Sequence, residues 1–256
     1  MAEILSFPNS VLIAGGTKGI GLGIALKFSR PGAKVFLSYS SDDQAAKLAS
    51  DLVVERGATP YLIKENIGSK SGGVEVIRRV SEHSSYLDVI VHSAAVPNPG
   101  FLAEQPIDEI VEAVEIGGMA LLYLVQPAMK LLKSGSSVIF LSGVSTYLVL
   151  PKHGALAGAK ALGECFAKYL AIECATKGIN FNTLSVGPVD TELFRSVRGN
   201  TVDGQPIPPP LTPNGLRLNT DNIAEVADFL VSNAGKMIRG QTILVDGGLS
   251  TTVRSS

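Results

Sequence analysis

The sequence is poor in the features that mark several classes of protein. It has no tryptophan and two cysteines, and its 22 basic residues nearly balance its 23 acidic residues, for a net charge of −1. Because this balance leaves no excess positive charge, it gives no electrostatic basis for binding nucleic acid or an anionic membrane. No apolar run approaches the roughly 20 residues that a membrane span needs. A nucleic-acid-binding protein and a membrane protein are therefore not expected.

The few cysteines do not form a motif. Cys165 and Cys174 lie in a predicted helix at a separation of about two and a half turns, which places them on opposite faces. We expect reduced packing thiols rather than a metal or redox pair, and we predict no metal site. The stretch MAEILSFPNS carries Glu3 and Pro8 and lacks a basic region before an apolar core, so no signal peptide is expected. These observations predict a cytoplasmic protein.

What the sequence does contain is an alternation of short apolar runs and helical patterns. The predicted strands cover residues 10–16, 34–40, 59–67, 87–95, 136–143, 179–187 and 241–248. The predicted helices between them include 43–57, 103–133 and 152–177. Near-continuous apolar strands that alternate with helices indicate a parallel sheet covered on both faces. The pattern predicts an α/β fold with a doubly wound parallel sheet, as a single domain over residues 1–256.

One long segment, about residues 190–221, interrupts this alternation. It is rich in proline, glycine and asparagine and follows the end of a predicted strand. A loop of this length in a compact domain is usually disordered or functional. We expect it to form a lid over a substrate.

The stretch AGGTKGIG at residues 14–21 is the first chemical signal. Gly15, Gly19 and Gly21 follow the first predicted strand and open the first predicted helix. Glycines in this position let the backbone approach a pyrophosphate, and the N–H groups and dipole of the helix favour its negative charge. The stretch predicts dinucleotide binding.

This glycine spacing also resembles that of the short-chain dehydrogenases/reductases, and four later segments extend the resemblance. They are ENI (65–67), VHSAA (91–95), SVGPVDT (185–191) and GQTILVDGG (240–248), in the family's order, so that the resemblance covers about residues 9–249. It implies a Rossmann fold and a nicotinamide dinucleotide cofactor. The residues that it implies for cofactor binding are Gly15, Thr17, Lys18, Gly19, Ile20, Gly21, Tyr39, Asn66, Ile67, Ser93, Ala94, Lys160, Gly187, Val189 and Thr191.

The end of the second predicted strand bears on which dinucleotide binds. An acidic residue there would bond the ribose 2′-hydroxyl and repel a 2′-phosphate, but this sequence has Tyr39. Lys18 lies where NADP-using members of the family often carry a basic residue. Asp42 and Asp43 follow closely and oppose this interpretation. We predict NADP, with NAD as the disfavoured alternative.

The usual catalytic groups of the family are replaced. The resemblance aligns Lys160 with the family's lysine, but Leu156 stands at the tyrosine position, Gly143 at the serine position and Glu115 at the asparagine position. Leucine has no proton to give and glycine has no hydroxyl. Carbonyl reduction by the usual tyrosine is therefore excluded.

A subgroup, the short-chain-type enoyl-acyl-carrier-protein reductases, resembles the chain more closely. These enzymes place their tyrosine seven residues before the lysine, where this sequence has His153. On a helix, positions 153, 156 and 160 share one face, so His153 and Lys160 are predicted to face a substrate beside Leu156. An imidazole, with an ordinary pKa near 6.5, is a better acid at neutral pH than a phenol. His153 could equally be a packing or capping residue at the start of the helix.

Glu115 has two interpretations as well. It could form a buried ion pair with Lys160, or it could act as a general base, as in an isomerase or cyclase. The leading prediction is an NADP(H)-dependent oxidoreductase that reduces an activated C=C bond of an enoyl thioester or enone, with His153, Lys160 and Glu115 as catalytic candidates. The alternatives are a non-redox isomerase, dehydratase or cyclase on the same scaffold, and a cofactor-binding protein without catalysis.

The expected partners follow from the same resemblance. They are a small-molecule or acyl-thioester substrate, which a carrier protein could deliver, and further copies of the chain. Leu121, Leu124 and Val125 on the predicted helix 103–133 are too many apolar positions for one subunit to cover. We therefore predict a symmetric homodimer or homotetramer.

Overall fold

Seven parallel strands form the centre of the molecule. The computed structural model describes residues 8–198, 201–202 and 205–251, with the backbone alone at 197–198, 201–202 and 205–206. The strand order is β3-β2-β1-β4-β5-β6-β9, and every neighbouring pair is parallel. The strands are β1 (Ser10–Ala14), β2 (Lys34–Tyr39), β3 (Thr59–Lys64), β4 (Leu87–His92), β5 (Leu132–Gly143), β6 (Asn180–Val186) and β9 (Thr242–Val245). This confirms the predicted doubly wound sheet.

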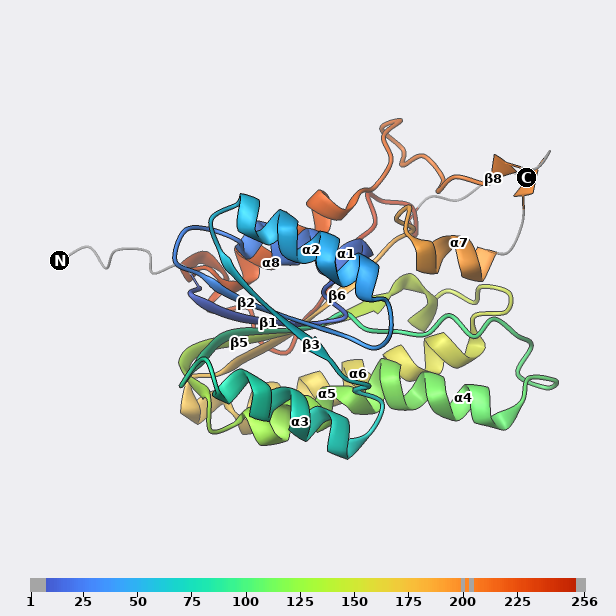
Figure 1. Ribbon diagram of the computed structural model, residues 1–256. Coiled ribbons are helices and arrows are strands. Elements are labelled where there is room, and N and C mark those ends of the chain that lie inside the picture. Colours follow the sequence, from blue (N-terminus) through green and yellow to red (C-terminus); the bar gives the residue numbers. More distant parts are fainter. Residues whose placement is uncertain (1–7, 199–200, 203–204, 252–256) are drawn as a thin grey trace.

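Helices cover both faces of the sheet (Figure 1). One face carries α1 (Gly19–Phe28), α2 (Asp43–Glu55) and α8 (Thr220–Val231). The other carries α3 (Lys70–Ser81), α4 (Ile107–Val114), α5 (Ala120–Ala128) and α6 (Gly154–Glu173). Because the chain turns from β3 back past β1 to β4, the carboxyl ends of β1 and β4 flank a crevice, which is where ligands bind in folds of this type.

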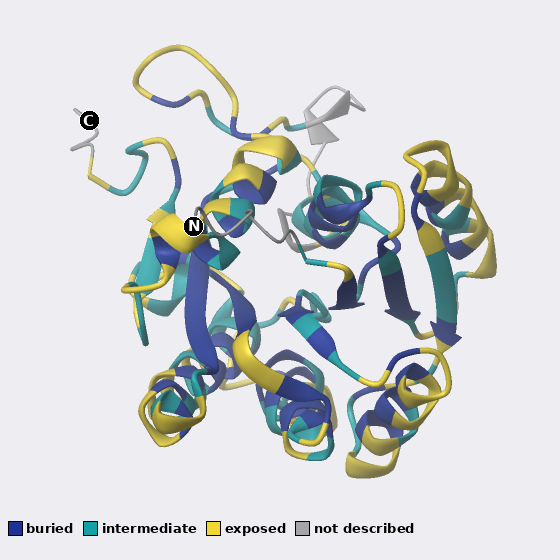
Figure 2. Cartoon of the chain, turned by 90° about the vertical axis from the view of Figure 1, so that its left-hand side faces the viewer, coloured by how far each residue is buried: buried dark blue, intermediate teal, exposed yellow. Residues whose placement is uncertain are grey.

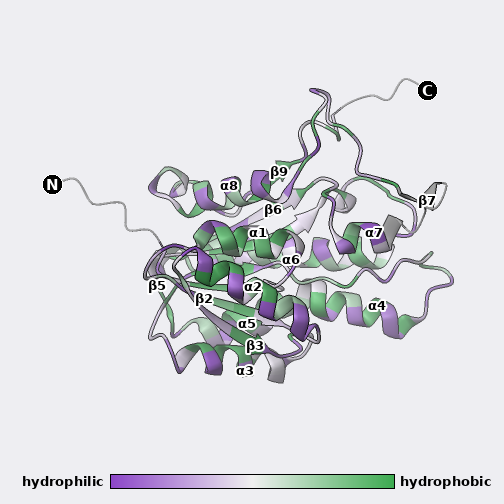
Figure 3. Ribbon diagram, turned by 45° about the horizontal axis from the view of Figure 1, so that its top comes forward, coloured by the Kyte–Doolittle hydropathy of each residue, from purple (hydrophilic) through white to green (hydrophobic). Residues whose placement is uncertain are grey.

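Two apolar layers, one on each face of the sheet, form the core (Figure 2). Phe36 and Phe140 lie in the layer under α3, α5 and α6, whereas Ile13 and Leu184 lie in the layer under α1 and α8. The outer helices α2 and α3 mix hydrophobic and hydrophilic residues, with Val53 and Val76 among those turned inward (Figure 3). The near-continuous apolar strands are thus buried on both faces, as parallel sheets require.

The predicted helix 103–133 is interrupted. It consists of α4, a π-helical turn at Glu115–Met119, and α5. Gly117 and Gly118 in this turn pack against α6, and a Cβ on Gly118 would lie 2.6 Å from the carbonyl oxygen of Ala159. Close approach of the two helices therefore depends on the glycines, and the helical pattern alone could not show the extra residue in the turn.

The reasoning that predicted an oligomer was wrong in one respect. Leu121, Leu124 and Val125 are fully buried within a single chain, because α3 and the sheet cover them. They belong to Ile107–Ala128, the one helical stretch among the described residues that is long and apolar enough, by length and composition, to cross a membrane. Their burial in the core is the behaviour of a core helix.

The structure also bears on the predictions for the two cysteines and for the lid segment. Cys174 is buried in the core and Cys165 is exposed, so packing describes Cys174 alone. The segment predicted as a lid contains α7 (Glu192–Arg198) and a two-stranded ladder of β7 (Thr201–Val202) and β8 (Gln205–Pro206). Its residues 199–200 and 203–204, like residues 1–7 and 252–256 of the predicted domain, lie outside the described part of the chain.

Candidate active site

The turn between β1 and α1 is built for close approach to a ligand. Gly15 and Gly19 have φ angles of +74° and +52°, which glycine adopts without strain. A Cβ on Gly15 would lie 2.9 Å from the backbone of Ala94, and one on Gly21 would lie 2.1 Å from the carbonyl oxygen of Gly15. Gly21 thus keeps the turn tight from within, whereas Gly15 faces the cavity. The N-terminus of α1 begins at Gly19 and offers unpaired N–H groups to an anion.

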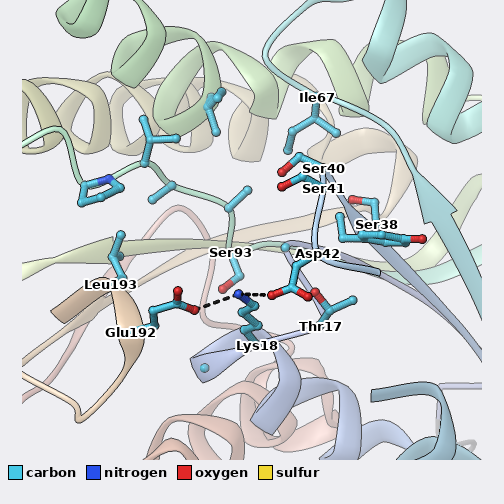
Figure 4. Close-up of a pocket in the computed structure, with 18 of the residues that line it drawn as sticks. Thr17, Lys18, Ser38, Ser40, Ser41, Asp42, Ile67, Ser93, Glu192 and Leu193 are labelled. Carbon is cyan, nitrogen blue, oxygen red and sulfur yellow. Dashed lines mark hydrogen bonds and ion pairs between the residues drawn. The ribbon is translucent and has the colours of Figure 1, made fainter. Parts of the chain in front are cut away.

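A first cavity of about 450 Å³ opens beside this turn, at the carboxyl ends of β1 to β4 (Figure 4). It brings together most of the residues predicted to bind a cofactor. They are Gly15, Thr17, Lys18, Gly19, Ile20, Tyr39, Asn66, Ile67, Ser93, Ala94 and Thr191. The wall is completed by residues that were not among the predicted cofactor-binding residues, namely Ser38, Ser40, Ser41, Asp42, Glu65, Ala95, Val96, Pro97, Ile116, Glu192, Leu193 and Ser196.

Lys18 joins three elements in this cavity. Its Nζ lies 2.6 Å from a carboxylate oxygen of Asp42 and 2.8 Å from one of Glu192 (Figure 4). Asp42 is the N-cap of α2, where it also accepts the N–H of Ala45, and Glu192 is the first residue of α7. The hydrogen bond with Asp42, followed by that with Glu192, raises the pKa of Lys18. The cation expected to attract a phosphate is therefore already paired with two carboxylates.

Tyr39 is hydrogen-bonded to Asp43, which follows Asp42 in the chain. Its hydroxyl donates to Asp43 Oδ1 at 2.9 Å, and the other carboxylate oxygen of Asp43 pairs with Lys64 at 2.6 Å. Asp43 thus points to Tyr39 and Lys64, while Asp42 points to Lys18. The position that an acid would occupy at the end of β2 carries a phenol ring.

A second cavity of about 660 Å³ adjoins the first, because Ile20, Thr191 and Leu193 line both. Its wall is mostly apolar. Predicted residues that line it are His153, Gly187, Val189 and Thr191, together with Leu156 and Gly143, which stand at the family's tyrosine and serine positions. His153 and Leu156 therefore share one cavity, as their spacing on the helix predicted.

The ring of His153 is oriented by its own backbone segment. His153 precedes the first residue of α6, and its imidazole does not cap that helix. Nδ1 lies 2.8 Å from the carbonyl oxygen of Pro151. Because a carbonyl oxygen can only accept, Nδ1 carries a hydrogen, and Nε2 is the nitrogen left for the cavity. In the neutral ring Nε2 is an acceptor, and it becomes a donor when the ring is protonated.

Lys160 lies deeper than the sequence predicted. It is 6% exposed and is not among the residues that line either described cavity. Its Nζ donates to the carbonyl oxygen of Ala94 at 3.1 Å and lies 4.9 Å from the centre of the Phe140 ring. Burial lowers the pKa of Lys160 to about 7. The ammonium therefore supports the wall of the first cavity from behind rather than facing the second cavity beside His153.

His92 shares this buried region. Its ring centre lies 5.2 Å from that of Phe140, and the residue is fully buried. Burial, and then the charge of Lys160, lower the pKa of His92 to about 3, so the ring is neutral at physiological pH. A neutral, buried imidazole packs beside Lys160 without adding a second positive charge.

Glu115 does not reach the lysine. It begins the π-helical turn and is partly buried. Within the described chain, no hydrogen bond or ion pair joins Glu115 to Lys160, and Glu115 is not among the residues that line the two cavities.

Ser145 is the residue that sequence reasoning missed most clearly, whereas Asp42 was named only as a residue that opposes NADP binding. Ser145 lines the second cavity two residues after β5 ends, and Asp42 lines the first cavity shortly after β2 ends. Polar residues directly after the carboxyl end of a parallel strand are the available signal, because these ends form the ligand-binding edge.

Comparisons with known proteins agree with this geometry. The family model described as Enoyl-(Acyl carrier protein) reductase matches residues 14–250. The chain is 27% identical to versicolorin reductase stcU of Emericella nidulans, over 93% of this chain and 94% of that protein. It is 25% identical to tetrahydroxynaphthalene reductase of Pyricularia oryzae, over 93% and 88% of the respective chains.

A solved structure shows the same fold. The crystal structure of a short chain dehydrogenase from Burkholderia cenocepacia in complex with NADP covers 93% of this chain and 96% of its own, with a TM-score of 0.81 and 21% identity. The match of the family model over nearly the whole chain carries the assignment. This chain belongs to the short-chain dehydrogenase/reductase family of oxidoreductases.

Proposed function

We propose that this protein is an NADP(H)-dependent reductase of activated C=C bonds, such as those of enoyl thioesters or enones, and that His153 acts where the family uses a tyrosine. The observation that carries the proposal is the shared cavity of His153 and Leu156, which adjoins the cavity of the glycine turn. The related versicolorin and tetrahydroxynaphthalene proteins are named as reductases, which supports reduction as the direction of the reaction.

The first cavity fits a nicotinamide dinucleotide. Gly15 lines this cavity and packs against the backbone of Ala94, where any Cβ would clash, and the N-terminus of α1 begins beside it at Gly19. Thr17 and Ser93 add hydroxyls to the wall, and Val189 and Thr191 extend it into the second cavity. When bound, the reduced cofactor supplies a hydride.

The preference for NADP rests on the wall near β2. Tyr39 replaces the acid that would repel a 2′-phosphate, and Ser40 and Ser41 offer hydroxyls. Lys18 is the cation of this wall, although Asp42 and Glu192 hold it. A 2′-phosphate would bind Lys18 by displacing a carboxylate, so the preference over NAD is expected to be modest.

Reduction of an enoyl substrate needs a donor at the carbonyl oxygen. A hydride added to the β-carbon forms the new C–H bond, and the electrons of the C=C bond move onto the carbonyl oxygen as an enolate. His153, protonated on both nitrogens, can donate from Nε2 to this oxygen while Nδ1 remains bonded to Pro151. Transfer of the Nε2 proton to this oxygen gives an enol and a neutral ring. The α-carbon then takes a proton from water while the O–H proton returns to Nε2, so the net change is one hydride and one solvent proton across the double bond.

Leu156 and Lys160 have supporting roles in this proposal. Leu156 gives the cavity an apolar wall that excludes water and strengthens the hydrogen bond from His153. Lys160 is a positioning residue, because its bond to Ala94 holds the loop after β4 against α6.

The segment 190–221 is proposed to be the lid. Leu193 and Ser196 of α7 line both cavities, and Phe194 and Pro210 line the second. Side chains from this segment therefore form part of the wall of both cavities. A substrate would enter beneath α7, either as a free molecule or as an acyl thioester on a carrier protein.

We also propose that the protein assembles as a homodimer or homotetramer. The support is a set of exposed apolar side chains on two neighbouring helices, Ile107 and Val111 on α4 and Tyr169 and Ile172 on α6. Exposed apolar side chains on helices that pack side by side can be covered by a second copy of the chain.

The proposed activity is tested by mixing the protein with NADPH or NADH and a crotonyl thioester, an enone or a ketone. Loss of nicotinamide absorbance with the thioester or enone supports the proposal. Cofactor binding without turnover on any of these compounds contradicts it. That result would favour an isomerase, dehydratase or cyclase, or a binding protein without catalysis.

A further inference from the structure

The second cavity holds few polar side chains, and most of them are already engaged. Thr191 Oγ1 accepts the N–H of Phe194, and Ser196 donates to the carbonyl oxygen of Leu193. His153 uses Nδ1 to bond Pro151. Within the described part of the chain, the hydroxyl of Ser145 has no protein hydrogen-bond partner.

The hydroxyls beside Ser145 on the same segment are used differently. Ser142 donates to a carboxylate oxygen of Glu164, and Thr146 donates to the carbonyl oxygen of Gly143 at 3.2 Å. Neither residue lines the cavity, whereas Ser145 does. Of Ser142, Ser145 and Thr146, Ser145 therefore has the free hydroxyl, and this residue lines the cavity.

Gly143 leaves space next to that hydroxyl. A Cβ built on Gly143 would lie 3.9 Å from Ser145 Oγ and 3.7 Å from the carbonyl oxygen of Val186, which are ordinary contact distances. Both residues line the second cavity, together with His153 and Leu156. Ser145 thus shares a mostly apolar chamber with the imidazole, and a ligand atom can reach its hydroxyl beside Gly143.

Lys152 also lines the second cavity, but its ammonium is not placed to serve as the donor in place of Ser145. Lys152 lines the cavity, but its Nζ lies 5.6 Å from the centre of the Phe101 ring and the residue is exposed. A solvated ammonium at the rim contributes less to charge stabilisation than a donor in an apolar wall.

We propose that Ser145 is a catalytic residue whose hydroxyl donates a hydrogen bond to the carbonyl oxygen of the substrate. This inference rests on the proposed function, because it concerns the oxygen that becomes negative when a hydride adds to the β-carbon. The hydroxyl is neutral and can rotate about its C–O bond, so it donates whether or not His153 is protonated. Two donors, Ser145 Oγ and His153 Nε2, then share the developing charge, and no proton leaves Ser145.

Removal of the hydroxyl tests the role in turnover. Ser145→Ala is expected to lower kcat for an enone by about 10²- to 10³-fold, the usual effect of losing one donor to an oxyanion. The dissociation constant of NADPH should not change, since Ser145 lines the second cavity and does not line the first. Ser145→Thr, which keeps the hydroxyl, should recover part of the rate.

Two further variants distinguish the effect of the Ser145 hydroxyl from an effect of changing the residues around it. Thr146→Val removes a neighbouring hydroxyl that bonds Gly143 and does not line the cavity, so it is the matched control and should leave kcat unchanged. In a Ser145→Ala background, Gly143→Ser should restore part of the rate, because a side chain fits at position 143 and would point a hydroxyl into the same space.

A spectroscopic measurement distinguishes this inference from the proposed function. The probe is a cyclic enone labelled at its carbonyl carbon, bound to the protein with oxidised NADP. A hydrogen bond from Ser145 lowers the carbonyl stretching frequency, and Ser145→Ala should raise it again. If the wild-type protein shows this shift but reduces none of the substrates, the reductase proposal fails and the Ser145 donor stands.

The opposite result overturns the inference. If Ser145→Ala keeps both the wild-type turnover and the wild-type carbonyl frequency, Ser145 does not touch the substrate. Failure of the enone to bind the wild-type complex would overturn the Ser145 donor as well. Loss of turnover with an unchanged frequency would assign Ser145 a structural role, which also contradicts the proposal.

Discussion

Lys18 and Glu192 tie the glycine turn to the first residue of α7, with 2.8 Å between Nζ and the carboxylate oxygen. Asp42 holds the same ammonium from the opposite side at 2.6 Å (Figure 4). A phosphate that enters the first cavity must therefore compete with two carboxylates for one cation. Cofactor binding and the position of α7 are linked through this lysine.

Removing one competitor should strengthen the binding of NADPH. We expect Glu192→Gln to lower the dissociation constant of NADPH by roughly two- to fivefold, the scale of exposed ion pairs, with less effect on NADH. Lys18→Ala should weaken NADPH binding more than NADH binding. Calorimetric titration measures both constants.

The control for this prediction is Glu225→Gln, which breaks an exposed pair with Lys27 away from the cavity. It should change neither constant. The proposed preference for NADP(H) means that the wild-type protein should bind NADPH more tightly than NADH. Equal or reversed dissociation constants would contradict it.

Burial of Lys160 predicts a particular pH dependence of stability. Its pKa is lowered from 10.5 to about 7 in the folded protein. Between these values the unfolded chain binds more protons at this site than the folded chain does. The free energy of unfolding should therefore rise with pH over this interval, by up to about 1.4 kcal/mol per pH unit from this group.

Urea unfolding between pH 7 and pH 10 measures this contribution. Lys160→Met should remove the rise, whereas Lys168→Met, at an exposed position on the same helix, should keep it. The same slope in the wild-type protein and in Lys160→Met would show that Lys160 is charged in the folded state. Because Lys160 supports Ala94, Lys160→Met should also weaken cofactor binding and turnover.

The parts of the fold that the sequence predicted are those in which neighbouring residues carry the signal. The apolar run at Ser10–Ala14 predicts a buried parallel strand, and the glycines that follow it predict the turn. The cofactor wall could be predicted for the same reason, since its residues directly follow the strand ends. Leu156 and His153 could be placed in one cavity because they are three residues apart, with Leu156 in the first turn of α6 and His153 directly before it.

The parts that sequence reasoning missed depend on contacts between distant segments. Lys160 bonds Ala94, which is 66 residues earlier, so helical spacing could not show that the lysine turns toward β4. The π-helical turn at Glu115 depends on how closely Gly118 approaches Ala159. Leu121 is covered by α3, which the analysis of one helix could not reveal.

A hydroxyl at position 156 should change the reaction. Leu156 lines the second cavity, so Leu156→Tyr places a phenol there and is expected to create measurable ketone reduction with NADPH. Leu156→Phe is the matched control, because it adds the same ring without the hydroxyl. Adding Gly143→Ser to Leu156→Tyr should increase the new activity further. Equal ketone reduction by the Tyr and Phe variants would contradict the prediction.

The exposed apolar residues on α6 should lie in a subunit interface. Ile172 and Tyr169 are 71% and 67% exposed in a single chain. We expect light scattering at micromolar concentration to give the mass of a dimer or tetramer, and Ile172→Glu or Tyr169→Glu to shift it toward the monomer. Leu48→Glu, at an exposed apolar position on α2, is the control. A monomeric wild-type protein would contradict the assembly prediction.

The most direct test of the account is the turnover of His153→Phe with NADPH and a crotonyl thioester or enone that the wild-type protein reduces. The ring of phenylalanine fills similar space in the cavity but has no nitrogen. We expect an unchanged dissociation constant for NADPH and a turnover lowered by roughly 10²- to 10⁴-fold, the usual contribution of a general acid. Unchanged turnover would remove His153 from the mechanism.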